Sequence, residues 1–210
     1  MKAERLDTFA SYFGPIHWTF MFRGVRFTGF YAAVAGTGFP HERRLWELLE
    51  RLPGLPPARC HVAVMHYWPF IETPDEPAWE IADPQQYDNW YFSIDPPHRR
   101  PLMYLLAAAR VDALFCGHVH TGRAVQRVGS IRLYRSPAAG NTPQLAERWP
   151  DAERRVGFHR CEVTDSGILV SFVPGDDQCD EFDTYGPWGH PAEEERDYSK
   201  ARQRPPLTPS

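Results

Sequence analysis

The sequence predicts an α/β fold, and two observations carry this prediction. Two short apolar runs, Val62–Met65 and Val111–Cys116, have the length of buried strands and are separated by a segment with helical periodicity. Each run leads into histidine: His66 follows the first, and Gly117-His118-Val119-His120 follows the second. A strand, a helix and a second strand form a β-α-β unit, in which both parallel strands end at one edge of the sheet. Ligands of such sheets bind at that edge.

The first half of the chain carries a hairpin and a helix. Residues 16–32 predict a β-hairpin, because large apolar side chains alternate with other residues on both sides of Arg23-Gly24. His17 falls on the opposite face from the aromatic residues, so we expect it at the surface. Residues 41–52 predict an amphipathic helix with leucines at helical spacing, and the proline-rich residues 53–57 end it before strand 60–65.

Further elements follow in the second half. Residues 98–110 predict a helix that delivers the chain to the Gly-His-Val-His segment, with Asp95 near its start and Pro101 in its first turns. Residues 123–127 and 131–134 predict a hairpin about Gly129. Strands 156–164 and 168–173 are expected to follow, joined at residues 165–167.

Two regions lack a recognisable periodicity. Residues 67–97 are rich in proline and aromatic side chains, and we expect an irregular segment that caps the histidine edge; the alternative is a packed surface excursion. From residue 174 onward the chain is rich in Pro, Asp, Glu and Gly, which indicates a poorly ordered tail that includes His190. The predicted organisation is therefore one domain over residues 1–173 and a tail over 174–210.

Composition narrows the functional classes. The chain has 210 residues and a net charge of −4, and it contains no basic patch interleaved with aromatic residues, so nucleic acid is not an expected partner. No stretch approaches the 18 or so apolar residues of a membrane span. The four cysteines form no C-x-x-C pair and indicate a reducing compartment. With no signal peptide in the sequence, we expect a cytoplasmic protein.

The histidines are the candidate metal ligands. On an extended segment alternate side chains share one face, so His118 and His120 are expected to project the same way. His66, at the end of the neighbouring strand, is then the natural third imidazole, although hydrogen-bonded loop histidines are the plainer interpretation. Imidazoles gathered at one strand edge are what a metal site needs.

These strings resemble a known family. Val62-Ala63-Val64-Met65-His66 and the segment Val111–His120 look like the last two metal motifs of the calcineurin-like metallophosphoesterases. Tyr12-Phe13-Gly14-Pro15, which leads into the aromatic hairpin, agrees with that resemblance, which covers roughly residues 9 to 172. It implies part of a four-layer α/β/β/α sandwich with mixed sheets.

The chain also departs from this family. The family's earlier motifs, D-x-H, G-D-x-x-D and G-N-H-D/E, do not occur in it. These motifs carry the bridging aspartate, other metal ligands and the histidine that protonates the leaving group. The chain therefore resembles the carboxyl-terminal part of such a domain, and no catalytic or substrate-binding residue can be assigned in it.

The resemblance implies metal-dependent hydrolysis of a phosphoester of unknown class. Two divalent ions (Mn, Fe or Zn) would bind the phosphate and activate a bridging water. By resemblance, His66 and His118 match ligands of one ion, and His120 matches a ligand of the other.

Two alternatives remain open from the sequence. The chain is a non-catalytic binding or regulatory module on the same fold, or it holds one zinc ion through its three histidines. Carboxylates of the 67–97 segment are available to complete a site, although solvated charges are the simpler interpretation; these are Glu72, Asp75, Glu76, Asp88 and Asp95.

Overall fold

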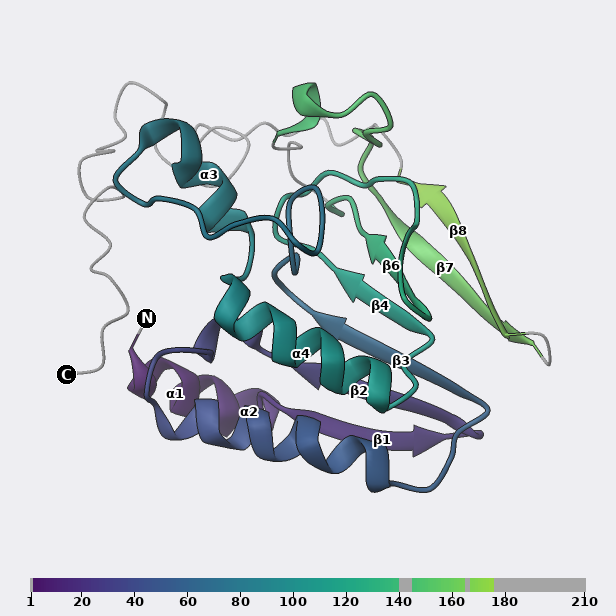
Figure 1. Ribbon diagram of the computed structural model, residues 1–210. Coiled ribbons are helices and arrows are strands. Elements are labelled where there is room, and N and C mark those ends of the chain that lie inside the picture. The colour runs from purple at the N-terminus through teal and green to yellow at the C-terminus, as the bar shows by residue number, and fades with distance from the viewer. Residues whose placement is uncertain (1, 140–144, 165–166, 176–210) are drawn as a thin grey trace.

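A mixed six-stranded sheet forms the centre of the protein (Figure 1). The computed structural model describes residues 2–139, 145–164 and 167–175. In spatial order the strands are β1 (Trp18–Phe22), β2 (Val25–Phe30), β3 (Cys60–Met65), β4 (Ala113–Cys116), β6 (Ile131–Arg135) and β5 (Gln126–Val128). The four inner strands are parallel, and the two edge strands are antiparallel to their neighbours. This arrangement confirms the α/β fold class.

Both predicted hairpins at the edges of the sheet are present, although β5 begins at Gln126 rather than at residue 123. Arg23 and Gly24 connect β1 to β2 with φ angles of 49° and 78°. Positive φ at both central residues is the property of a type I′ turn, whose twist matches that of paired strands. The β5–β6 hairpin turns at Gly129, with φ of 60°. The β3–β4 pairing is parallel, as the β-α-β interpretation requires.

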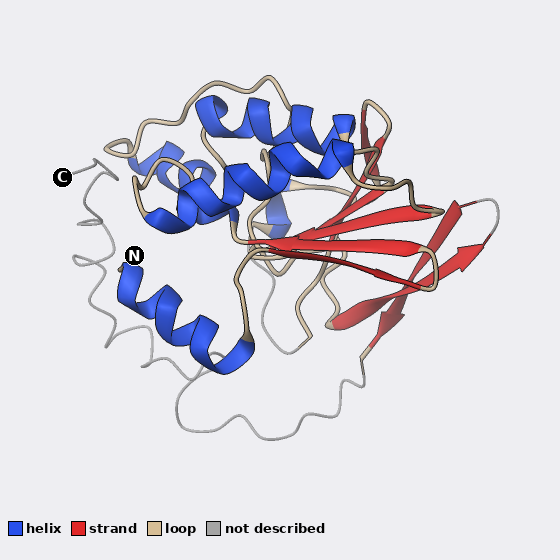
Figure 2. Cartoon of the chain, turned by 90° about the horizontal axis from the view of Figure 1, so that it is seen from below, coloured by secondary structure: helices blue, strands red, loops and turns tan. Residues whose placement is uncertain are grey.

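Helices cover one face of this sheet (Figure 2). The layer consists of α2 (Pro40–Arg51) and α4 (Pro96–Ala108), whose buried side chains include Leu45, Leu49 and Leu102. They pack in one core with Ala63 and Leu114 of the inner strands. The helix α4 begins two residues before the predicted start at residue 98. The periodicity did not identify a further helix, α1 (Ala3–Phe13), nor three short 3-10 helices, η1 (Ala32–Val34), η2 (Leu52–Gly54) and η3 (Ala146–Arg148).

A two-stranded hairpin covers part of the other face. The strands β7 (Gly157–Thr164) and β8 (Gly167–Pro174) pair antiparallel, and Ile168 packs with Val25, Val62 and Ala113. Across the part of the chain that the structure describes, the layers are helices, sheet and hairpin, which is consistent with part of a four-layer sandwich. The predicted tail lies outside the described residues from position 176 onward, with His190 in it.

The expectation of an irregular segment over residues 67–97 is wrong in one place, because this segment contains α3 (Pro84–Phe92). The Asp83 carboxylate accepts a hydrogen bond from the Gln85 amide at 2.9 Å, and Pro84 occupies the first turn. Asp followed by Pro is a helix-start signal that requires no apolar periodicity.

Among the described residues, no helix is both long enough and apolar enough to span a membrane.

His17 is half-buried, where the strand pattern predicted a surface position. Its Nε2 donates to the His41 carbonyl at 3.0 Å, and its Nδ1 accepts from the Tyr31 amide at 3.3 Å. The ring therefore joins β1 to α2 and to the end of β2. Alternation along one strand identified the face of His17, but it could not show that α2 packs against that position.

Candidate functional site

The parallel pairing of β3 and β4 brings His66 and His118 together. Met65 is opposite Cys116 in the sheet register, and the Gly117 amide donates to the His66 carbonyl at 3.0 Å. The imidazole nitrogens His118 Nδ1 and His66 Nε2 are consequently 3.0 Å apart. Two of the three predicted ligands thus meet at the carboxyl edge of the sheet.

The backbone of the histidine segment is not extended, so the premise of strand alternation does not hold here. The strand β4 ends at Cys116, and the Val119 amide donates to the Gly117 carbonyl at 3.0 Å. Both His118 and His120 have left-handed backbones, with φ of 73° and 60°. Residues other than glycine rarely adopt this conformation, and such strain is concentrated at functional sites. The turn, rather than a shared strand face, determines where these rings point.

His120 acts on the pair electrostatically. Burial is the larger cause that lowers the pKa of His66, and positive charge on His120 lowers it further. A lowered pKa favours the neutral imidazole, which is the form that binds metals. Within residues 2–139, 145–164 and 167–175, however, no group of three or more His, Cys, Asp or Glu side chains is placed to hold a metal ion.

The residues therefore fit a metal in part. Two nitrogen ligands at about 2.0–2.1 Å from one ion are roughly 3 Å apart, which matches the separation of the His66 and His118 nitrogens. A dinuclear centre requires more ligands than the described residues assemble. The pair is suited to one ion, and the dinuclear centre implied by the resemblance is not fitted by this part of the chain alone.

Aromatic side chains enclose His118. The ring centroids of Tyr67 and Tyr91 lie 4.1 and 5.0 Å from that of His118, and the Phe92 centroid lies at 5.1 Å. His118 Nε2 also lies 3.2 Å from the Tyr91 carbonyl oxygen, with which it hydrogen-bonds as donor. Residues of α3 thus cover the histidine edge, as expected for the 67–97 segment.

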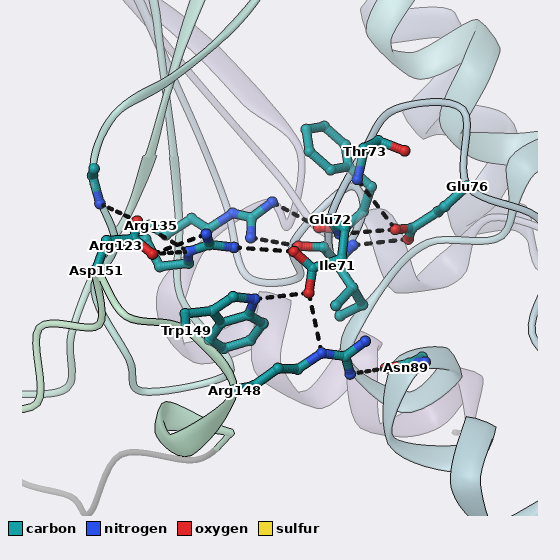
Figure 3. Close-up of polar contacts among 12 residues, drawn as sticks. Ile71, Glu72, Thr73, Glu76, Asn89, Arg123, Arg135, Arg148, Trp149 and Asp151 are labelled. Carbon is teal, nitrogen blue, oxygen red and sulfur yellow. Dashed lines mark hydrogen bonds and ion pairs between the residues drawn. The ribbon is translucent and has the colours of Figure 1, made fainter.

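The buried side chain of Arg135 holds the first residues of the 67–97 segment in place (Figure 3). Arg135 donates to the carbonyls of Ile71 and Phe70 at 2.8 and 2.9 Å. Its guanidinium lies over the Trp68 ring, 4.1 Å from the centroid. Burial lowers the pKa of Arg135 to about 10, and the charge of Arg123 contributes to this shift. Arg135 thereby links β6 to the chain that leaves His66.

Arg135 is a residue that the sequence motifs did not identify, although a signal for it existed. In β6 the side chains of Ile131, Leu133 and Arg135 alternate with more accessible ones, and all three are buried. An arginine on the buried face of a strand is rare unless polar groups satisfy it. The alternation of buried and accessible residues along β6 therefore indicates that Arg135 has a structural role.

Ion pairs occupy two of the carboxylates that were available to complete a metal site. Glu72 accepts from Trp149 Nε1 at 2.8 Å and from Arg148 Nε at 3.1 Å (Figure 3). Glu76 accepts from the Ile71 and Glu72 amides, and it pairs with Arg99 at 3.3 Å. Asp75 and Asp88 are exposed, and Asp95 faces a separate cavity. None of these five carboxylates joins the histidine pair in this structure.

Comparison with known proteins relates the chain by fold alone. No protein-family model and no curated protein sequence matches it. The purple acid phosphatase PPD1 from yellow lupin (Lupinus luteus) seeds superposes with a TM-score of 0.50 at 12% identity, over 77% of this chain and 30% of that one. Over the matched residues the chain shares the fold of that structure. At this identity the similarity describes the arrangement of strands and helices only.

Two further solved structures match less well. GAP50, the anchor in the inner membrane complex of Plasmodium, has a TM-score of 0.47 at 16% identity, over 77% of this chain and 50% of that one. PhoD has a TM-score of 0.39 at 12% identity, over 74% of this chain and 40% of that one. The chain spans half or less of each of these three structures.

Proposed function

We propose that this chain supplies the histidine ligands of a metal-dependent phosphoesterase. The observation that carries the proposal is the approach of His118 Nδ1 to His66 Nε2 at 3.0 Å, at the edge of the sheet where α/β proteins bind ligands. The phosphoesterase-like fold and the left-handed backbone at His118 and His120 support it. A divalent ion at such a site lowers the pKa of bound water and offsets charge on a phosphate oxygen.

The proposal places the remaining ligands outside the described residues. A two-metal site needs a bridging carboxylate, and the carboxylates of the 67–97 segment are engaged elsewhere or exposed. In the family that the chain resembles, the missing carboxylates and the proton donor belong to the D-x-H, G-D-x-x-D and G-N-H-D/E motifs, which do not occur in this sequence. His120 belongs to the second metal in this scheme.

Metal titration tests the proposal directly. We expect the 210-residue chain to bind about one zinc or manganese ion through the pair. Replacing His66→Ala or His118→Ala should lower the bound metal measured by elemental analysis. The control is His159→Ala, because His159 lies on β7 and hydrogen-bonds Ser136 Oγ at 3.1 Å, away from the pair. Unchanged metal content in both test variants contradicts the proposal.

Activity provides the second test. General acid catalysis contributes about 10²–10⁴ in rate, so a chain without a proton donor and with an incomplete metal site should hydrolyse bis-p-nitrophenyl phosphate negligibly with added manganese. Joining a segment that carries the three absent motifs should restore turnover, and His66→Ala in that longer chain should abolish it. Vigorous metal-dependent hydrolysis by residues 1–210 alone contradicts this scheme, and Asp88 and Asp95 would then be the first carboxylates to mutate.

One observation favours a second candidate, a non-catalytic binding module. The described residues gather no third metal ligand beside the pair. Under this alternative the chain joined to the missing motifs stays inactive although it folds, which separates it from the phosphoesterase.

A further inference from the structure

A small cavity lies beside the histidine pair and shares two aromatic residues with it. Its volume is about 60 Å³, and three of its walls are Tyr67, Trp90 and Tyr91. The short side chains of Ala32 and Ala33, on η1, also line the cavity. Tyr67 and Tyr91 are the same residues that pack against the His118 ring.

The cavity also contains a carboxylate with a partly buried side chain. Asp95 occupies the position before α4, but its side chain does not cap the helix. It instead lines the cavity and accepts a hydrogen bond from the Trp90 side chain. Burial raises the pKa of the Asp95 carboxyl, while the charges of His98 and Arg99 lower it. A partly desolvated carboxylate gains from a cation placed next to it.

One carboxylate lines the cavity, and a second interacts with a residue of its wall. His98 also lines the cavity, and the charges of Asp95 and of Glu42 both interact with it. Glu42 is itself held by the amides of Gly36 and Gly38, at 2.6 and 2.8 Å, and these contacts lower its pKa. The cavity therefore combines aromatic side chains with one partly buried carboxylate.

We propose that this cavity binds the ammonium group of an organic cation. Aromatic faces attract ammonium and quaternary ammonium groups through the ring quadrupole, and a neighbouring carboxylate adds to that attraction. Size agrees with a compact group, because an apolar cavity of about 150 Å³ is the size that takes up benzene, and this one measures about 60 Å³. A trimethylammonium or primary ammonium group is compact enough, whereas a purine base is not.

If the chain acts as the proposed phosphoesterase, this cation site indicates its substrate class. The inference about the substrate therefore rests on the proposed function. Because Tyr67 and Tyr91 contact both the cavity and His118, a cation held here lies next to the histidine pair. In phosphoesters of choline or ethanolamine, two carbons separate the nitrogen from the ester oxygen. The inferred class is therefore phosphoesters of amino alcohols, in which the cationic nitrogen and the phosphate lie close together in one molecule.

Calorimetric titration with choline tests the cation site without hydrolysis. The matched probe is 3,3-dimethylbutan-1-ol, which has the shape of choline but carries no charge. We expect choline to bind at least about tenfold more tightly, because cation–π attraction and the carboxylate act only on the charged molecule. Equal affinity for the two probes, or preferential binding of adenosine, overturns the proposal.

Two variants and one control locate the site. Asp95→Asn and Trp90→Leu should each weaken choline binding by about tenfold, whereas Asp88→Asn, an exposed carboxylate of the same segment, should not. Asp95→Asn keeps the shape of the side chain, and thermal unfolding shows whether Trp90→Leu still folds. Choline binding that survives both substitutions overturns the proposal.

The titrations are repeated in EDTA, so that failure of the metal site and failure of the cation site are distinguishable. Choline binding in EDTA, together with no metal binding by the pair, refutes the proposed function and leaves the cation site intact. Glycerophosphocholine and phosphatidylcholine vesicles then distinguish a soluble phosphodiester from a lipid headgroup. Binding of either is expected, and binding of neither overturns the inferred substrate class.

Discussion

His118 Nδ1 lies 3.0 Å from His66 Nε2, although 52 positions separate the two residues. The contact depends on the register of β3 and β4, in which Met65 and Cys116 are opposite each other. It also depends on a left-handed backbone at His118, where φ is 73°. The sheet brings the two strands to one edge, and the turn after β4 directs the second ring toward the first.

The backbone at His118 leads to a prediction about stability. A left-handed conformation costs a residue with a Cβ atom roughly 1 kcal/mol, and glycine escapes this cost. We therefore expect His118→Gly to be more stable than His118→Ala by about 1 kcal/mol, as measured by urea unfolding. Neither variant should bind metal through the pair.

The matched control for this comparison is His159, which lies within strand β7. There the order should reverse, with His159→Ala more stable than His159→Gly by about 0.5–1 kcal/mol, because glycine weakens a strand. If alanine is also the more stable replacement at position 118, the left-handed backbone does not determine the stability of this turn.

The pair of Arg99 and Glu76 predicts a large loss of stability on neutralising one partner. Their side chains are only 1% and 4% exposed, and Glu76 also accepts from the amides of Ile71 and Glu72. Glu76→Gln leaves the Arg99 charge buried without its counter-charge, which should lower the free energy of unfolding by about 3 kcal/mol. Chemical denaturation measures this loss.

An exposed ion pair provides the comparison for Glu76. Arg43 and Glu47 on α2 have side chains that are 76% and 63% exposed. Glu47→Gln should change the free energy of unfolding by no more than about 0.5 kcal/mol. Similar losses for the two variants are inconsistent with a special contribution from the buried pair.

The position of His17 predicts acid-sensitive stability. Burial lowers the pKa of His17 to about 4, below the unfolded value of 6.5. Between these two pH values the unfolded chain binds more protons, so the free energy of unfolding rises with pH across this window and falls on acidification. The contribution of His17 is up to about 3 kcal/mol and is lost as the pH falls from 6.5 to 4.

Comparison with His17→Gln isolates this contribution. Burial also lowers the pKa of His61 and of His159, and both act in the same direction in the variant. Urea unfolding between pH 7 and 4 should therefore still show a loss for His17→Gln, but a shallower one than for the unmodified chain. If the free energy of unfolding changes with pH equally in the variant and in the unmodified chain, His17 is not a source of the pH dependence.

The edge strand β1 predicts self-association. Phe20 and Phe22 alternate along this strand and are 52% and 57% exposed. An edge strand with unpaired backbone groups and exposed aromatic side chains is a site of aggregation or partner binding. We expect the chain to self-associate in sedimentation velocity experiments, and Phe20→Thr combined with Phe22→Thr to reduce this.

Tyr104 on α4 provides the control for self-association. It is 73% exposed but lies in a helix, where backbone groups are paired internally. Tyr104→Thr should leave self-association unchanged. A monodisperse monomer of the unmodified chain at high concentration contradicts the prediction and favours the binding-module alternative.

Local sequence patterns predicted most of the secondary structure. Both edge hairpins, the helix before β3 and the parallel β3–β4 pairing lie where alternation, helical periodicity and turn residues placed them. These signals are local, because each depends on the spacing of apolar residues within one segment or on one turn. The helix α3 escaped detection because its start signal, Asp83-Pro84, is not periodic.

The sequence by itself determined the fold class and the two strand ends that carry histidine, because apolar spacing fixes which segments form strands and where they stop. Only the tertiary structure decided that His66 meets His118, that His17 is enclosed by α2, and that Glu72 and Glu76 pair with arginines. These contacts depend on sheet register and on backbone dihedral angles at single residues. Such quantities arise from packing between segments far apart in the chain, and residue spacing does not encode them.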